Sequence, residues 1–199
     1  MIDSTILAGL LGVGGSIAGT ILGYKLNNSK ADVNVYIDNR VVVYYLKKEF
    51  CMYLPLTITN EGSKSSTISD FRVTLVSPTN QEWTLYWLCF AEDNTFKGES
   101  WSDDKRASPI LIHGNSGNQY HVKLIETTAT SQGLSSVLLP AGEYKIKLEY
   151  FDRNRKPVSN QEYKFKIDTE FQQILAERRE DFDNLGTVIF NLTQGAEKA

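Results

Sequence analysis

The stretch LLPAGEYKIKLEYFD, residues 138–152, decides the fold together with QEYKFKID at 161–168. In the first segment Tyr144, Ile146 and Leu148 alternate with charged residues, so one face of an extended chain is apolar and the other is charged. The second segment alternates in the same way, and a polar turn separates the two. The pattern predicts an antiparallel β-hairpin with one buried face.

The same period of two recurs along most of the preceding chain. Apolar and polar residues alternate in short segments that end at Gly, Pro, Asn or Asp. These segments lie at 31–38, 40–46, 53–63, 71–78, 82–90, 109–114 and 120–125. About nine short strands, without a helical period among them, predict an antiparallel β-sandwich. Residues 91–106 break the rhythm, and we expect a charged loop there that carries Phe96 and Trp101.

Two stretches of this region resemble immunoglobulin-like domains. The sequence LPLTITNEGSKSSTISDFRVTL (54–75) resembles a strand–turn–strand unit of that group. Residues 138–152 resemble its penultimate strand, in which a tyrosine soon after a turn ties the corner through its hydroxyl, and Tyr144 matches that tyrosine. The resemblance covers roughly residues 31–168. It implies a mainly β, immunoglobulin-like β-sandwich and no particular function.

After the hairpin the period becomes helical, in TEFQQILAERREDFDNL (169–185). Asp168 or Thr169 is expected as the N-cap, and Gly186 as the residue that ends this short C-terminal helix. The apolar residues fall near one face: Phe171, Ile174, Leu175, Phe182 and Leu185. The segment GTVIFNLT (186–193) is expected to pair as an edge strand or to dock on a neighbouring element.

The N-terminal stretch TILAGLLGVGGSIAGTILGY (5–24) has no charge and no proline. Twenty helical residues span roughly 30 Å, so the stretch predicts a single transmembrane helix. Small residues at every fourth position let a second helix approach closely and favour a packing or pore-lining face. They are Gly12, Gly15, Ser16, Gly19, Thr20 and Gly23. An inert anchor and a signal peptide are the alternatives.

Flanking charge orients the predicted span. Lys25 and Lys30 follow it and only Asp3 precedes it, which places the C-terminal part in the cytoplasm and the N-terminus outside. The expected location is the bacterial inner membrane, with one pass. The expected division is a transmembrane helix at 1–26, a linker at 27–30, a β-sandwich domain at 31–168, and a C-terminal helix and tail at 169–199.

The sequence has no motif that indicates an enzyme, a metal site or a cofactor. The spacing of Cys51 and Cys89 fits no metal or redox motif, and so few cysteines favour a reducing compartment. His113 and His121 are expected to be surface histidines. The net charge of −3 is too small to identify a partner.

The outer face of the hairpin is the candidate ligand site. It is expected to carry four lysines, with arginines at the turn and with His121 and Lys123 as an extension: Lys145, Lys147, Lys164, Lys166, Arg153 and Arg155. Like charges opposite each other on a sheet are unfavourable, so their concentration favours an anionic ligand such as a nucleotide or oligonucleotide. Trp83, Tyr86, Trp87 or Trp101 are candidate stacking partners. Lipid headgroups are another anion that would fit, and a solvated or edge-protecting face is the alternative.

The layout resembles the small membrane effectors of bacterial anti-phage defence, among them the Hailong-type channel effectors. The resemblance rests on the span at 5–24 and the attached β domain. It implies an antiviral pore or ion channel in the lipid bilayer, gated by a nucleotide-binding β-sandwich, with a nucleotidyltransferase as partner. Self-association into a homo-oligomer, with a tetramer as one option, is expected. The alternative function is a single-pass anchored scaffold or adaptor that presents an immunoglobulin-like module to a protein partner.

Overall fold

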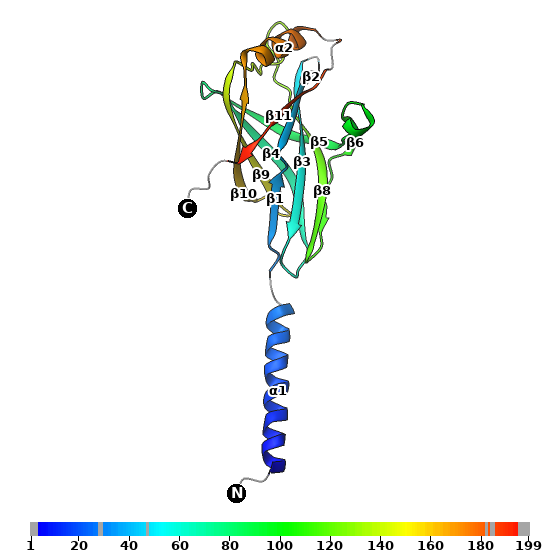
Figure 1. Cartoon of the computed structure of the whole chain (residues 1–199), viewed down its shortest axis with the longest axis vertical. Coiled ribbons are helices and arrows are strands. Elements are labelled where there is room, and N and C mark those ends of the chain that lie inside the picture. Colours follow the sequence, from blue (N-terminus) through cyan, green and yellow to red (C-terminus); the bar gives the residue numbers. More distant parts are fainter. Residues whose placement is uncertain (1–3, 28–29, 47, 182, 184–185, 195–199) are drawn as a thin grey trace.

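The structure is a computed structural model that describes residues 4–27, 30–46, 48–181, 183 and 186–194. The described part is mainly β, with a helix at each end of the molecule (Figure 1). Helix α1 (Ser4–Asn27) stands clear of the strands, and the short helix α2 (Thr169–Glu180) lies at the opposite end. The two helices therefore mark a base, nearest α1, and a top, nearest α2.

The strands pair antiparallel throughout the described residues and follow the alternating segments of the sequence. Their bounds are β1 Val33–Ile37, β2 Arg40–Leu46, β3 Glu49–Asn60, β4 Ser66–Val76, β5 Glu82–Glu92, β6 Ser102–Arg106, β7 Ile110–Ile112, β8 Ser116–Glu126, β9 Gly142–Asp152, β10 Pro157–Ile167, β11 Val188–Asn191 and β12 Thr193–Gln194. The predicted charged loop at 91–106 contains a 3₁₀ turn and strand β6. Strand β6 was not predicted, because its sequence SDDKR does not alternate apolar and polar residues.

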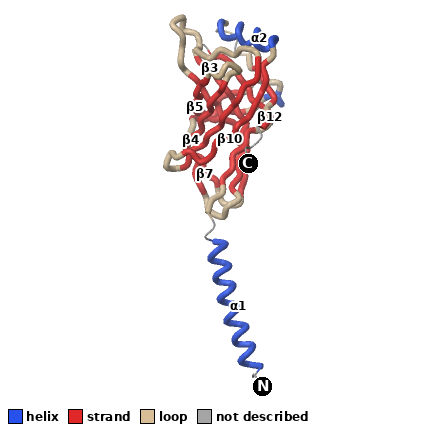
Figure 2. The backbone as a smooth tube through the Cα atoms, turned by 90° about the vertical axis from the view of Figure 1, so that its left-hand side faces the viewer, coloured by secondary structure: helices blue, strands red, loops and turns tan. Residues whose placement is uncertain are grey.

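The strand order explains how the sheet curls around its core. The order is β11-β2-β3-β8-β5-β4-β9-β10-β12, with β1 beside β3, β6 beside β5 and β7 beside β4. The C-terminal segment pairs with both ends of this path, since β11 bonds β2 and β12 bonds β10. Figure 2 shows the resulting body of strands with α2 across its top. The predicted edge strand at 186–193 therefore joins the two ends of the sheet.

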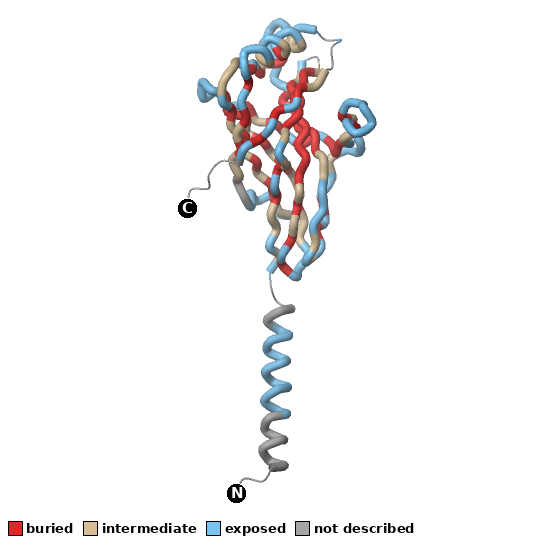
Figure 3. Tube along the Cα trace, in the orientation of Figure 1, coloured by how far each residue is buried: buried red, intermediate tan, exposed pale blue. Residues whose placement is uncertain are grey.

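A continuous core fills this body, as the buried inner faces in Figure 3 show. The inward residues of the predicted hairpin, Tyr144, Ile146 and Leu148, belong to it. The predicted corner bond is present, because the Tyr144 hydroxyl donates to the Pro140 carbonyl at 2.8 Å. Burial of these inner faces is the main force that holds the strands together.

Helix α1 corrects the predicted transmembrane helix. Among the residues that the structure describes, no helix is both long enough and apolar enough to cross a membrane. Between Gly12 and Tyr24 five positions are glycine, and Ser16 and Thr20 add hydroxyls. The membrane and ion-channel predictions are therefore wrong. The single-pass placement in the bacterial inner membrane depended on the same span and is also wrong.

The small residues of α1 lie where the helical period placed them. A Cβ added at Gly12, Gly15, Gly19 or Gly23 would meet no atom of the described chain within 4 Å. The hydroxyls of Ser16 and Thr20 donate to the carbonyls four residues earlier, at 2.9 and 2.8 Å. No described residue outside α1 therefore packs against these four glycines, and self-association stays a prediction.

Helix α2 begins as predicted and ends earlier than predicted. The Asp168 carboxylate accepts a hydrogen bond from the Phe171 amide at 2.9 Å and caps the first turn. The helix ends at Glu180, whereas the sequence predicted helix to residue 185. Leu175 is buried against the top of the β core. The predicted contacts of Phe182 and Leu185 lie outside the described residues.

Candidate functional site

The predicted lysine face is present on the outer side of β9 and β10, but glutamates lie among and beside its lysines. Three lysines make ion pairs with carboxylates: Lys145 with Glu162 at 3.7 Å, Lys147 with Glu82 at 3.6 Å and Lys164 with Glu143 at 3.0 Å. Lys166 lies opposite Glu143 in the strand register. The glutamates offset the positive charge that an anion would need, which favours the alternative of a solvated face.

The predicted extension of this face does not reach the surface. Lys123 is only 3% exposed, and its ammonium bonds both carboxylate oxygens of Asp103, at 2.8 and 3.0 Å. The ammonium also lies 5.5 Å from the ring centroid of Tyr44. Buried and paired on β8, Lys123 fastens β6 to the sheet and is not available to a ligand. The sequence did not predict this ion pair, because Asp103 was expected to lie in a loop.

Of the four candidate stacking aromatics, only Tyr86 presents its ring to solvent. Trp83 and Trp87 belong to the core, where Trp87 packs edge-on against Phe71 with ring centroids 5.1 Å apart. Trp101 is 6% exposed, in a second buried cluster on the outer side of the sheet. Base stacking on the tryptophans would therefore require the fold to open.

Trp101 is covered by polar and aromatic neighbours. Its ring lies 5.3 Å from that of Tyr53 and 4.9 Å from that of His121, and the Arg40 guanidinium lies 5.5 Å from it. Arg40 also bonds the Asp93 carboxylate. His121 is thus half-buried, not a surface histidine, and this burial lowers its pKa.

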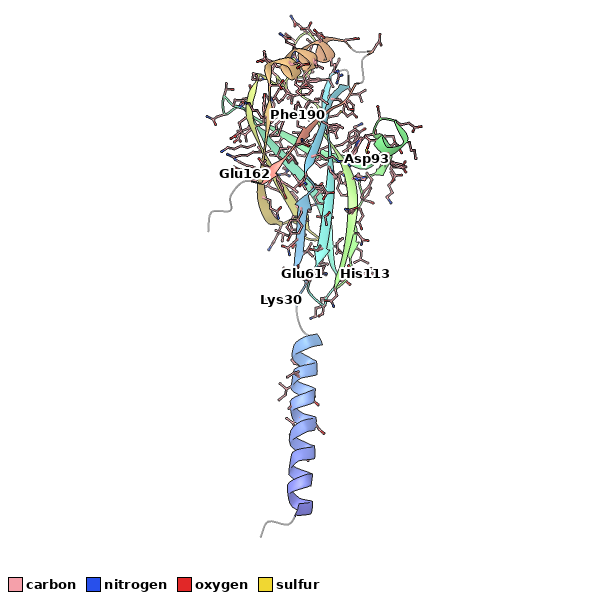
Figure 4. The ribbon with its side chains drawn as sticks, in the orientation of Figure 1. Lys30, Glu61, Asp93, His113, Glu162 and Phe190 are labelled. Carbon is pink, nitrogen blue, oxygen red and sulfur yellow. The ribbon has the colours of Figure 1, made fainter. Side chains whose placement is uncertain are left out.

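A cationic pocket lies at the base, and we call it the base pocket. It has a volume of about 340 Å³ and brings together Lys30, Lys64 and Arg153 from three separate segments. Ser65, Ser66 and Thr67 supply hydroxyl groups to its wall. Figure 4 labels Lys30 at the end of the β body nearest α1. Of the predicted ligand residues, Arg153 alone lines this pocket, while Arg155 lies in the neighbouring turn.

Asn60 holds two walls of the base pocket in place. Its side-chain oxygen accepts hydrogen bonds from the amides of Asp32 and Gly62, at 3.0 and 3.1 Å. Its side-chain nitrogen donates to the carbonyls of Lys64 and His113, at 2.8 and 3.1 Å. A Cβ at Gly62 would lie 2.1 Å from the Lys30 carbonyl oxygen, so the chain segments meet closely here. The pocket is therefore shaped before any ligand arrives.

The third wall is the turn between β9 and β10. The Asp152 carboxylate accepts hydrogen bonds from the amides of Asn154 and Lys156, at 2.7 and 2.9 Å. These bonds, led by that from Lys156, lower the pKa of Asp152. Arg155 has a φ of 59°, in the left-handed region, which turns the chain back toward β10. The Asp152 carboxylate therefore bonds backbone amides of its own turn, and Asp152 and Arg153 both line the pocket.

Nucleophilic and metal chemistry find little support in the described residues. Burial raises the pKa of the Cys51 thiol to about 12 and that of Cys89 to about 11, so both thiols are protonated and weakly nucleophilic at neutral pH. Within the described ranges, no group of three His, Cys, Asp or Glu side chains is placed to hold a metal ion. The base pocket itself offers cationic side chains and hydroxyl groups.

Comparison with known proteins finds distant structural similarity only. No family model and no curated protein matches the chain. The putative ApaA protein of Bordetella pertussis is 10% identical, over 80% of this chain and 93% of its own, with a TM-score of 0.31. A putative lipoprotein (ycdA) of Bacillus subtilis is 14% identical, over 75% of this chain and 41% of its own, with a TM-score of 0.33. Similarity this low supports no inference about fold or function.

Proposed function

We propose that this chain is a non-catalytic binding module that holds a phosphate-bearing anion, such as a nucleotide or an oligonucleotide, in the base pocket. The observation that carries the proposal is the convergence of Lys30, Lys64 and Arg153 on one pocket of about 340 Å³. The Asp152 carboxylate on the same wall offsets only part of the charge of these three cations, and a bound anion would offset more of it. Hydroxyls on the same wall would supply hydrogen bonds to phosphate oxygens.

The pocket favours the phosphate part of such a ligand. None of the described residues that line it is aromatic, so the wall offers no ring on which a base would stack. Arg153 can bond two phosphate oxygens through its planar fork, whereas Lys30 and Lys64 act as point charges. We therefore expect tri- and diphosphate groups to bind more tightly than a neutral nucleoside, with little discrimination among bases.

The position of the pocket supports a sensing role. Lys30 lies between the end of α1 at Asn27 and the first strand at Val33, whereas Arg153 belongs to the β body. A ligand that contacts both would restrain the direction in which α1 leaves the β body. Ligand binding would thereby be reported at α1. An antiviral effector role and a nucleotidyltransferase partner stay predictions from the resemblance.

We further propose that the β body is an immunoglobulin-like sandwich. The support is the hydroxyl bond of Tyr144 to Pro140, four residues upstream, which corresponds to the tyrosine corner of that group. The scaffold or adaptor function remains the alternative. Phe96, 80% exposed at the 3₁₀ turn, is the aromatic side chain that we expect to anchor a protein partner in that case.

Calorimetric titration of the full chain with ATP and with inorganic pyrophosphate tests the proposal. We expect saturable binding that weakens with added salt, because charge attraction drives it. Arg153→Glu should reduce the affinity at least tenfold, since it replaces a cation with an anion on the wall. Lys147→Glu is the matched control, because it also changes the charge by two units but lies outside the pocket.

Either of two results would contradict the proposal. One is the absence of measurable binding of both probes at low salt. The other is binding that Arg153→Glu leaves unchanged and that the control variant abolishes, which would return the site to the lysine face.

A further inference from the structure

A second pocket lies at the top of the β body, under α2, and we call it the top pocket. Its volume is about 310 Å³, within the range of pockets that hold small molecules. One side is apolar and is formed by Tyr45, Leu138, Leu139 and Leu175. Arg179 also lines the pocket, together with polar residues such as Gln81 and Gln172. This combination of an apolar wall with one cation differs from the base pocket, whose lining is mainly polar.

Hydrogen bonds fix the walls of the top pocket. The Tyr45 hydroxyl donates to the Val137 carbonyl at 3.0 Å, and the Ala141 amide donates to the Gln172 side-chain oxygen at 2.9 Å. Together they fasten residues 137–141 to β2 and to α2. A pocket held in this way needs little ordering when a ligand binds, so less of the binding free energy is lost.

Arg179 brings a positive charge to this pocket without a carboxylate to offset it. Its Nε and Nη2 donate to the Ser135 carbonyl at 2.9 and 2.6 Å, which holds the guanidinium in place through a neutral group. None of the ion pairs found between described residues involves Arg179. A guanidinium held by a neutral carbonyl suits an anionic group on a ligand, because it keeps its positive charge.

We infer that the top pocket binds a small organic anion with an apolar body, such as an aromatic or branched carboxylate or sulfonate. The apolar body would lie on Leu138, Leu139 and Leu175, and the anionic group would approach Arg179. Polyphosphates would not be favoured here, because the apolar side cannot hydrogen-bond their oxygens. This site is separate from the proposed function, since the two pockets lie at opposite ends of the β body.

Fluorescence titration with 8-anilinonaphthalene-1-sulfonate tests the inference, because this probe combines an aromatic body with one sulfonate. The full chain should bind one equivalent with increased fluorescence. Ala176→Trp places a bulky ring on a pocket-lining position of α2 and should weaken binding at least tenfold. Gln173→Trp is the matched control, because Gln173 is exposed on the same helix and does not line the pocket.

Arg179→Lys separates the role of charge from that of the pocket shape. It keeps the charge but cannot maintain both bonds to Ser135, so binding should weaken several-fold with the unfolding temperature close to that of the wild type. Probe fluorescence that is equal in the wild type, Ala176→Trp and Gln173→Trp would overturn the inference. Such a signal would arise from apolar surface elsewhere, for example the exposed Val13, Ile17 and Ile21 of α1.

Discussion

His121 shows how much the neighbours of one residue change its behaviour. As part of a strand beside a glycine turn, it was predicted to be a surface histidine. The packing of Trp101 against it, with ring centroids 4.9 Å apart, makes it half-buried. Burial is the largest cause that lowers its pKa, Arg40 lowers it further, and Asp93 and Asp38 oppose the shift.

The lowered pKa predicts that stability depends on pH near neutrality. Between the folded pKa and the usual value of about 6.5, the unfolded chain holds a proton on this side chain that the folded chain does not. The free energy of unfolding should therefore fall as pH is lowered through this window. Urea unfolding at pH 7.5 and 5.5 measures it. His121→Gln should reduce the difference, whereas the control His113→Gln, at an exposed position, should keep it. A fall in stability equal in all three proteins would contradict this assignment.

Asn60 determines how separate elements meet at the base. It lies at the end of β3 and is 1% exposed. Its side chain bonds the segment before β1, the turn between β3 and β4, and the turn between β7 and β8. The sequence placed it only in a turn signal, Asn60-Glu61-Gly62. Its contacts could not be foreseen, because Asp32 and His113 are remote from it along the chain.

We predict that Asn60→Ala destabilises the fold by about 2–4 kcal/mol, because several buried donors and acceptors lose their partners. Asn118 is exposed on β8, so Asn118→Ala is the matched control. It should change the free energy of unfolding by no more than about 0.5 kcal/mol. Chemical unfolding of both variants measures the difference. Equal stability of the two variants would show that Asn60 does not organise the base.

At the level of elements, the sequence predicted those strands and the helix cap that depend on residues close together in the chain. Strands β2, β5 and β9 and the cap of α2 were found close to their predicted positions, since alternation and capping involve near neighbours. Strand β6 was missed, because its residues are charged and its pairing with β5 is what makes it extended. The uncharged run at 5–24 was given too much weight as evidence for a membrane span.

At the level of the whole molecule, the candidate site could be predicted only in part. The sequence indicated that cations near the β9–β10 hairpin were the feature to follow, and Arg153 does line a pocket. It could not supply Lys30 and Lys64, since the pairing of β1 with β3 and of β4 with β9 brings these segments together. It also could not reveal the glutamates opposite Lys145, Lys147 and Lys164, because ion pairs between strands depend on register.

Mapping the amide chemical shifts of the isotopically labelled full chain during titration with ATP tests the central claim most directly. The account predicts saturable shifts at residues 62–67 and 152–156, which border the base pocket, with small shifts at 143–149 and 162–166 on the lysine face. Arg153→Glu should suppress the shifts at 62–67 as well, because one ligand contacts both walls. Saturable shifts confined to the lysine face, or none at the base, would contradict the account.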